Sequence, residues 1–214
     1  MKKLLLIILS MLVMFSCDTD STLPNEPDMT LMSMEQNTIN PGDLPMPMIV
    51  GGEQVDPPCP DCKYPFMVSL QSSGWWGGHF CGGALVRPDW VITAAHCVEG
   101  ESASNLDVVI GLHNVNGTNG SQTRGVDQII SHPNYSGWSL DNDYALLLLD
   151  EPITDFEPIQ LCTDTAHDEE PVMSTVMGWG ATSSGGSSSN FLLEVDVLLT
   201  IVVGVILIQR LPTI

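Results

Sequence analysis

From Ile49 onward, the chain consists of short apolar runs separated by glycine, proline, asparagine and aspartate. The clearest runs are FMVSLQ, CGGALV, WVITAAHC, LDVVIGLH, VDQIISHP, DYALLLLD and VMSTVMGWG. Runs of this length that are bounded by turn residues predict β-strands, and no convincing helical stretch lies between them. The pattern therefore predicts an all-β sandwich or barrel.

The first 48 residues do not show this pattern of short strand-like runs. Two lysines and the apolar run LLLIILSMLVMF, too short to span a bilayer comfortably, predict a secretory signal peptide over residues 1–17. Its end, MFSC, resembles a lipobox, so we expect either lipidation of Cys17, which would tether the protein to a membrane, or conventional cleavage. Residues 18–48 lack a strand or helix period and are predicted to be a flexible tether or pro-segment. An exported protein, extracellular or periplasmic, is the expectation.

The charge balance limits the choice of partners. The chain has 26 Asp and Glu against 6 Lys and Arg, which gives a formal net charge of −20. Binding to nucleic acid or to an anionic membrane surface requires clustered basic side chains, so neither is expected as a partner. The acidic residues are interpreted as a solvated surface that keeps the protein soluble.

Six cysteines in an exported chain predict disulfides. Cys81 and Cys97 bracket two predicted strands joined by an RPDW turn, and a bridge between them would pin the segment that carries His96. Cys59 and Cys62 form CPDC, for which a local disulfide is favoured, because a redox motif lacks its βαβ context and a zinc site lacks a second ligand pair. Cys162 has no obvious partner if Cys17 is lipidated.

Of the five histidines, one is a candidate for a catalytic base. Four imidazoles are interpreted as surface or ordinary core residues: His79, His113, His132 and His167. His96 differs because its small neighbours Ala94 and Ala95 allow close contact with another element. A base of this kind needs a carboxylate to fix its tautomer, and Asp143, which precedes an apolar run, is the best candidate. A simple turn at DND is the alternative reading of that segment.

Five motifs together resemble one family. They are IVGG (49–52), CGGALV (81–86), WVITAAHC (90–97), DNDYALLLL (141–149) and GWG (178–180). Their order and spacing resemble the trypsin-like, chymotrypsin-fold serine endopeptidases over about residues 49–196. The resemblance implies two Greek-key β-barrels with the active site between them, polypeptide substrates, and neither a cofactor nor a metal.

The resemblance also implies residue roles. His96 corresponds to the general base, Asp143 to the carboxylate that orients it, and Cys81–Cys97 to the disulfide beside the histidine. Ile49 corresponds to the N-terminus that cleavage exposes in this family. Met48 stands where the family commonly has a basic residue, so a protease of another specificity would have to make that cut.

One family motif is missing from the printed sequence. The nucleophile follows His and Asp along the chain and sits in GDSGGP, but neither GDSGG nor GxSxG occurs in the 214 residues. Serines in the loop after GWG lack a rigid turn that would preorganise attack; they are Ser183, Ser184, Ser187, Ser188 and Ser189. The chain is therefore predicted to be inactive as it stands.

The family likeness stops near Val197, where a run of apolar and small residues extends to Ile208. The run is too short for a transmembrane helix, suits a buried strand, and would favour aggregation if uncovered. We interpret this change as truncation or a frameshift. The expected organisation is a first barrel over 49–155 and an incomplete second barrel with an aberrant tail over 156–214. The predicted function is an exported serine endopeptidase, with a non-catalytic binding module or a truncated remnant as the alternative.

Overall fold

The computed structural model describes residues 49, 52–56, 63–74, 77–118, 120–161, 172–183, 186–202 and 205–210; for 172, 199–202 and 205–210 it describes the backbone. The predicted signal peptide, the lipobox at Cys17 and the tether lie outside the described residues. The same holds for Cys59, Cys62, Cys162 and His167, so their predicted roles stay predictions.

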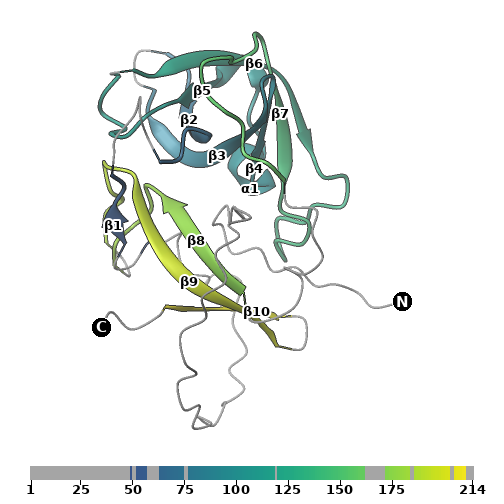
Figure 1. Cartoon of the computed structure of the whole chain (residues 1–214). Coiled ribbons are helices and arrows are strands. Elements are labelled where there is room, and N and C mark those ends of the chain that lie inside the picture. Colours follow the sequence, from purple (N-terminus) through teal and green to yellow (C-terminus); the bar gives the residue numbers. More distant parts are fainter. Residues whose placement is uncertain are drawn as a thin grey trace, which may run out of the picture.

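Six antiparallel strands close into a barrel in the order β2-β3-β4-β7-β6-β5 (Figure 1). The strands are β2 (Met67–Ser72), β3 (His79–Arg87), β4 (Trp90–Thr93), β5 (Leu106–Ile110), β6 (Gln122–Ser131) and β7 (Ala145–Leu149). A four-residue helix, α1 (Ala95–Val98), and a 3₁₀ helix, η2 (Ala103–Asn105), lie between β4 and β5. Closure pairs every strand on both sides, because a barrel has no free edge. The all-β prediction is confirmed.

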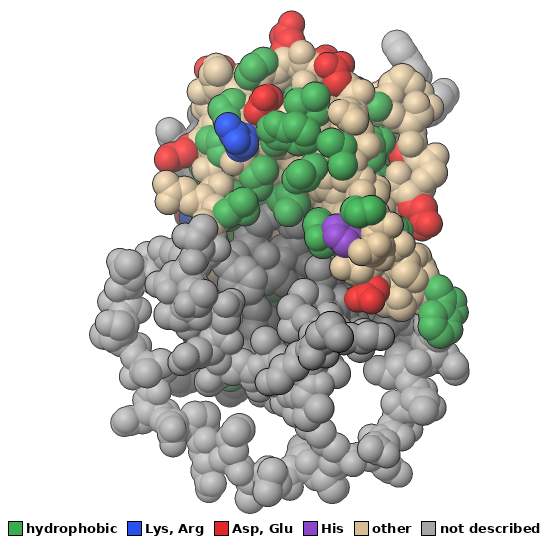
Figure 2. Space-filling model, turned by 90° about the vertical axis from the view of Figure 1, so that its right-hand side faces the viewer, with side chains coloured by type: hydrophobic (Ala, Val, Ile, Leu, Met, Phe, Trp, Pro, Cys, Tyr) green, Lys and Arg blue, Asp and Glu red, His purple; other side chains and the backbone are tan. Residues whose placement is uncertain are grey.

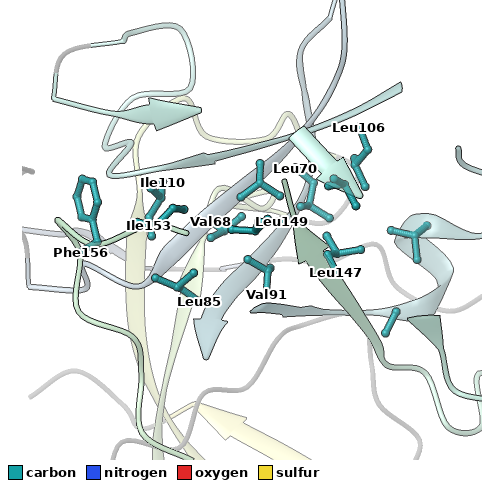
Figure 3. Close-up of a cluster of buried hydrophobic side chains, with 14 of the residues drawn as sticks. Val68, Leu70, Leu85, Val91, Leu106, Ile110, Leu147, Leu149, Ile153 and Phe156 are labelled. Atoms are coloured by element: carbon teal, nitrogen blue, oxygen red, sulfur yellow. The ribbon is translucent and has the colours of Figure 1, made fainter. Parts of the chain in front are cut away.

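Alternating side chains of these strands fill the barrel. In β7, Ala145, Leu147 and Leu149 are buried while Leu146 and Leu148 are half-buried, which is the period of two expected of a strand. Figure 3 shows the resulting cluster, in which side chains from all parts of the barrel converge. Its labelled members are Val68, Leu70, Leu85, Val91, Leu106, Ile110, Leu147, Leu149, Ile153 and Phe156. This core fixes the strands that carry the site.

A second, open sheet lies beside the barrel (Figure 1). Its central strand, β9 (Leu193–Val202), pairs antiparallel with β1 (Glu53–Gln54), β8 (Val172–Gly178) and β10 (Val205–Arg210). In the described residues this second unit is a four-stranded sheet and not a closed barrel. The apolar tail contributes the second half of β9 and the first part of β10, as its β-branched composition predicts. No helix in the described residues is long and apolar enough to cross a membrane.

A second apolar cluster joins the sheet to the barrel. It combines Met67 and Val109 of the barrel with Met177, Trp179 and Leu192 of the second unit. Backbone bonds from the Leu192 amide to the His113 carbonyl (2.8 Å) and from the Val115 amide to the Asn190 carbonyl (2.9 Å) cross the same junction. These contacts hold the two units at a defined separation, which creates a cleft between them.

The surface agrees with the acidic composition. Figure 2 shows carboxylates dispersed over one face of the barrel among hydrophobic and neutral side chains, with Lys and Arg in few places. Lys63, one of the six basic residues, is bound to Glu194 at 2.7 Å. With 26 acidic side chains against 6 basic ones, the chain has a large net negative charge, which favours solubility.

We expect Leu147→Ala to lower the free energy of unfolding by about 2–5 kcal/mol, because Leu147 is fully buried and its truncation leaves a cavity. Leu148→Ala, one position along the same strand and half-buried, is the matched control and should lose less. Urea unfolding followed by tryptophan fluorescence measures both. Equal losses would contradict the packing described for β7.

Candidate active site

His96 lies on a short helix that the sequence did not predict. The run WVITAAHC reads as one strand, but β4 ends at Thr93 and Ala95–Val98 form α1. Ala95 and Val98 are buried against the barrel core, so the helix is anchored on that side. The His96 side chain is 27% exposed and is accessible from the cleft.

Asp143 holds this imidazole from the barrel side. Its Oδ1 accepts the backbone N–H of His96 at 2.8 Å, and its Oδ2 lies 2.7 Å from His96 Nδ1. The Asp143 side chain is completely buried, and these two bonds compensate the loss of water around its carboxylate. Because an ionised carboxylate only accepts hydrogen bonds, the proton belongs on Nδ1 and Nε2 keeps its lone pair. The pair proposed from sequence is brought together.

The loop before β7 aims Asp143 inward through unusual backbone geometry. Leu140 and Asn142 have φ values of 53° and 56°, in the left-handed region that non-glycine residues rarely adopt. The side-chain Nδ2 of Asn142 donates to the Asn134 backbone carbonyl at 3.0 Å, which stabilises this conformation. Strain of this kind gathers where a side chain must be positioned. The DND segment is therefore both a turn and the source of the carboxylate.

The Cys81–Cys97 disulfide flanks the other side of the ring. It joins β3 to α1 with a Cα–Cα distance of 6.1 Å, in agreement with the expected bridge. Cys97 Sγ lies 3.4 Å from His96 Nε2. The imidazole therefore sits between a buried carboxylate and a disulfide, and its Nε2 edge lines the cleft.

The cleft has a volume of about 910 Å³ and lies between the barrel and the second unit. His79, His96 and Trp179 line it, together with Ser188 and Ser189. Ser188 belongs to a bridge with Ala181, and the Ser189 hydroxyl donates to the Phe191 carbonyl at 2.8 Å. Within the part of the chain that the structure describes, no serine hydroxyl is bonded to His96.

A model of the Trypsin family matches residues 49–201, which is most of the chain. The chain belongs to the trypsin family. Its relatives include Trypsin-2 of Salmo salar (40% identical over 146 residues, covering 66% of this chain and 57% of the relative). Trypsin of Squalus acanthias is 38% identical over 69% of this chain and 60% of its own, and human Granzyme M is 37% identical over 69% and 55%.

The family match covers more of the chain than the motifs did, which extended to about residue 196. It continues to residue 201, past the change of composition near Val197. The fold agrees with the double β-barrel of trypsins, with one barrel closed and the second represented by an open sheet. The chain spans between half and two thirds of the length of these trypsin relatives.

Ile49 lies at the wall of this trypsin-like cleft. Its side chain is 2% exposed, and its backbone N–H donates to the Ala181 carbonyl at 2.7 Å. A Cβ added at Gly178 would lie 3.5 Å from Ile49 Cδ1, so the two residues are neighbours. The φ of Gly178, 154°, also favours glycine at this position. The first residue of the IVGG motif and the GWG segment are therefore packed against each other.

His79 is a cleft residue that sequence reasoning treated as ordinary. Its Nδ1 lies 2.9 Å from Ser69 Oγ, and its ring meets Trp179 edge-on with centroids 5.1 Å apart. Burial lowers the pKa of His79 to about 4, because the cationic ring would lose its water shell. Of the other histidines, His113 contacts Gln54 and His132 packs on Tyr144.

We expect the disulfide-bonded chain to lose stability as pH falls from about 6.5 to about 4. The unfolded chain protonates His79 near its ordinary pKa of about 6.5, whereas the folded chain keeps it neutral down to about 4. Urea unfolding at a series of pH values measures this slope. Carboxylates also titrate in this range, so the test is a comparison with His79→Gln. The unfolding free energy of this variant should change less steeply with pH than that of the unsubstituted chain. Identical slopes would contradict the role of His79.

Proposed function

We propose that this chain carries the base and the orienting carboxylate of an exported trypsin-family serine endopeptidase, which hydrolyses peptide bonds. The observation that supports this most directly is the bond between His96 Nδ1 and the buried Asp143 Oδ2 at 2.7 Å, which leaves Nε2 free at the cleft. A peptide chain is the substrate class implied by the family.

In this mechanism His96 Nε2 accepts the proton of a serine hydroxyl while the serine oxygen attacks the carbonyl carbon. The imidazolium that forms is stabilised by Asp143, which stays ionised. The same proton then passes to the leaving amine, and water repeats the cycle to release the acyl group. The chain's own contribution is to hold one ring nitrogen protonated toward Asp143 and the other unprotonated toward the cleft.

The serine is the part that the printed residues do not supply. GDSGG does not occur in them, and the described serines of the loop after GWG are not bonded to His96. We therefore propose that residues 1–214 by themselves are inactive. A polypeptide-binding module without catalysis remains the second candidate, because the cleft exists without this serine.

We further propose that the protein is exported and that cleavage after Met48 exposes Ile49. The Cys81–Cys97 disulfide supports an oxidising compartment. The Ile49 nitrogen is already placed at Ala181, so an amine released there would lie at the cleft wall. Lipidation of Cys17 is the proposed anchor at the cell envelope.

Two measurements follow for the nucleophile. The 214-residue chain should neither hydrolyse peptides nor react with a fluorophosphonate probe. A chimera that begins at Ile49, so that no cleavage after Met48 is needed, and in which the segment after Asp196 is replaced by the corresponding segment of Salmo salar Trypsin-2, extended through the family's nucleophile motif, should do both.

In that chimera His96→Ala should lower kcat by about a million-fold, by analogy with removal of a triad base, whereas His132→Ala should leave it unchanged. A folded chimera that is inactive, or one that is indifferent to His96→Ala, would overturn the assigned role. Labelling of the 214-residue chain would show that one of its own serines reacts.

For export, N-terminal mass analysis should give lipid-modified Cys17 for the precursor in the envelope fraction and Ile49 for the processed form in the soluble fraction, because cleavage after Met48 removes the anchor. Cys17→Ser should move the precursor to the soluble fraction, because the acyl chains would be attached at Cys17. Serine at position 16 offers the control: Ser16→Ala keeps a small residue and should remain membrane-bound. An unmodified Cys17 in the envelope would contradict the anchor.

A further inference from the structure

We propose that Cys81, Cys97 and His96 form a zinc site that the disulfide closes and that its reduction opens. The proposal goes beyond peptide hydrolysis, and it does not require the proposed serine. In addition to proton transfer, His96 would bind zinc, and it would do so only when Cys81 and Cys97 are reduced.

The three donor atoms lie close together, but the two sulfurs are bonded to each other and must separate before they can bind a metal. Cys81 Sγ, Cys97 Sγ and a ring nitrogen of His96 all lie within 4.8 Å of one another, and Cys97 Sγ is 3.4 Å from Nε2. A tetrahedral zinc ion with bonds of about 2.3 Å to sulfur and about 2.0 Å to nitrogen keeps its ligand atoms roughly 3.5–3.8 Å apart. Once the sulfurs separate, only small movements are needed to bind the ion.

Asp143 supplies the outer-shell partner that such a site requires. Zinc-binding imidazoles commonly donate their other N–H to a carboxylate, which fixes the tautomer and raises the basicity of the ligand nitrogen. The Nδ1 contact to Asp143 Oδ2 has this arrangement, with a side chain that is completely buried. Nε2 is thereby held as an unprotonated donor at the correct edge of the ring.

Solvent, reductant and ion can all reach this cluster. Cys81, His96 and Cys97 are partly exposed and line the cleft of about 910 Å³. Three protein ligands leave a fourth position of the tetrahedron open, which water would occupy. A chain of net charge −20 also attracts divalent cations electrostatically.

The chemistry balances with a dithiol or phosphine as reductant. The disulfide accepts two electrons and two protons and becomes two thiols, while a dithiol is oxidised to its own disulfide. With a phosphine, one water supplies the oxygen of the phosphine oxide and the two thiol protons. Zinc then replaces the two thiol protons, which are released to solvent, and binds two thiolates and the neutral imidazole. In this state Nε2 is occupied by the metal and cannot accept a proton from a serine.

The test uses the full-length chain with Cys17, Cys59, Cys62 and Cys162 replaced by serine, so that only one cysteine pair can contribute. The chain is reduced with a phosphine under nitrogen, freed of reductant, and titrated with Co²⁺ as the probe for zinc. We expect one Co²⁺ per chain with a thiolate-to-cobalt charge-transfer band, displaced by Zn²⁺. The oxidised chain should show no such band.

Three further substitutions in this four-serine chain test whether the proposed residues, and not any histidine, are responsible for Zn²⁺ binding. Asp143→Asn keeps the side-chain size and should weaken Zn²⁺ binding by about 10–100-fold, as outer-shell substitutions do. His96→Ala should weaken it at least as much. His132→Ala, a partly exposed imidazole elsewhere on the barrel, should leave it unchanged.

Three results would overturn the proposal. They are equal Zn²⁺ affinity with and without His96, the same binding by the oxidised chain, and loss of the near-ultraviolet circular dichroism on reduction without recovery when Zn²⁺ is added. The last result would mean that the barrel does not persist without its disulfide, so the ligands would no longer be held together. Each readout is independent of proteolytic activity.

Discussion

The burial of the Asp143 carboxylate is the constraint on which the site depends. A charge with no access to water is tolerated only when hydrogen bonds replace its hydration. Asp143 obtains two of them from one residue, through the backbone N–H and Nδ1 of His96. This requirement couples the loop before β7 to the helix after β4, 47 positions away, and fixes the orientation of the ring. The left-handed residues Leu140 and Asn142 are the local cost of delivering that carboxylate.

The closed barrel and the open sheet contribute differently to this arrangement. The barrel has no unpaired edge, and its core includes buried residues of both α1 and β7. The open sheet adds the opposite wall of the cleft, and Trp179 joins the two through its burial and its bond to the His113 carbonyl at 3.3 Å. Base and carboxylate therefore belong to the barrel alone, whereas the cleft requires both units.

One imidazole faces two kinds of chemistry because its two nitrogens have different neighbours. Nδ1 is held by a carboxylate, and Nε2 lies at the cleft edge beside a disulfide sulfur. The proposed proton relay and the proposed zinc site use the same unprotonated nitrogen, since both roles need a free lone pair and a fixed tautomer. The state of the neighbouring sulfurs decides which partner the nitrogen can have.

The sequence by itself determined the features that depend on local pattern. Short alternating runs gave the all-β class, the five ordered motifs identified the family, and the charge pattern of DNDYALLLL singled out Asp143 as the partner of His96. It could not locate the end of β4, because Thr93, Ala94 and Ala95 continue the apolar run and only packing distinguishes a strand from a helical turn there. It also missed the place of His79 in the cleft and the 3.4 Å approach of Cys97 to Nε2. Those depend on how a closed barrel brings distant strands and rings together, and periodicity along the chain contains no information on that.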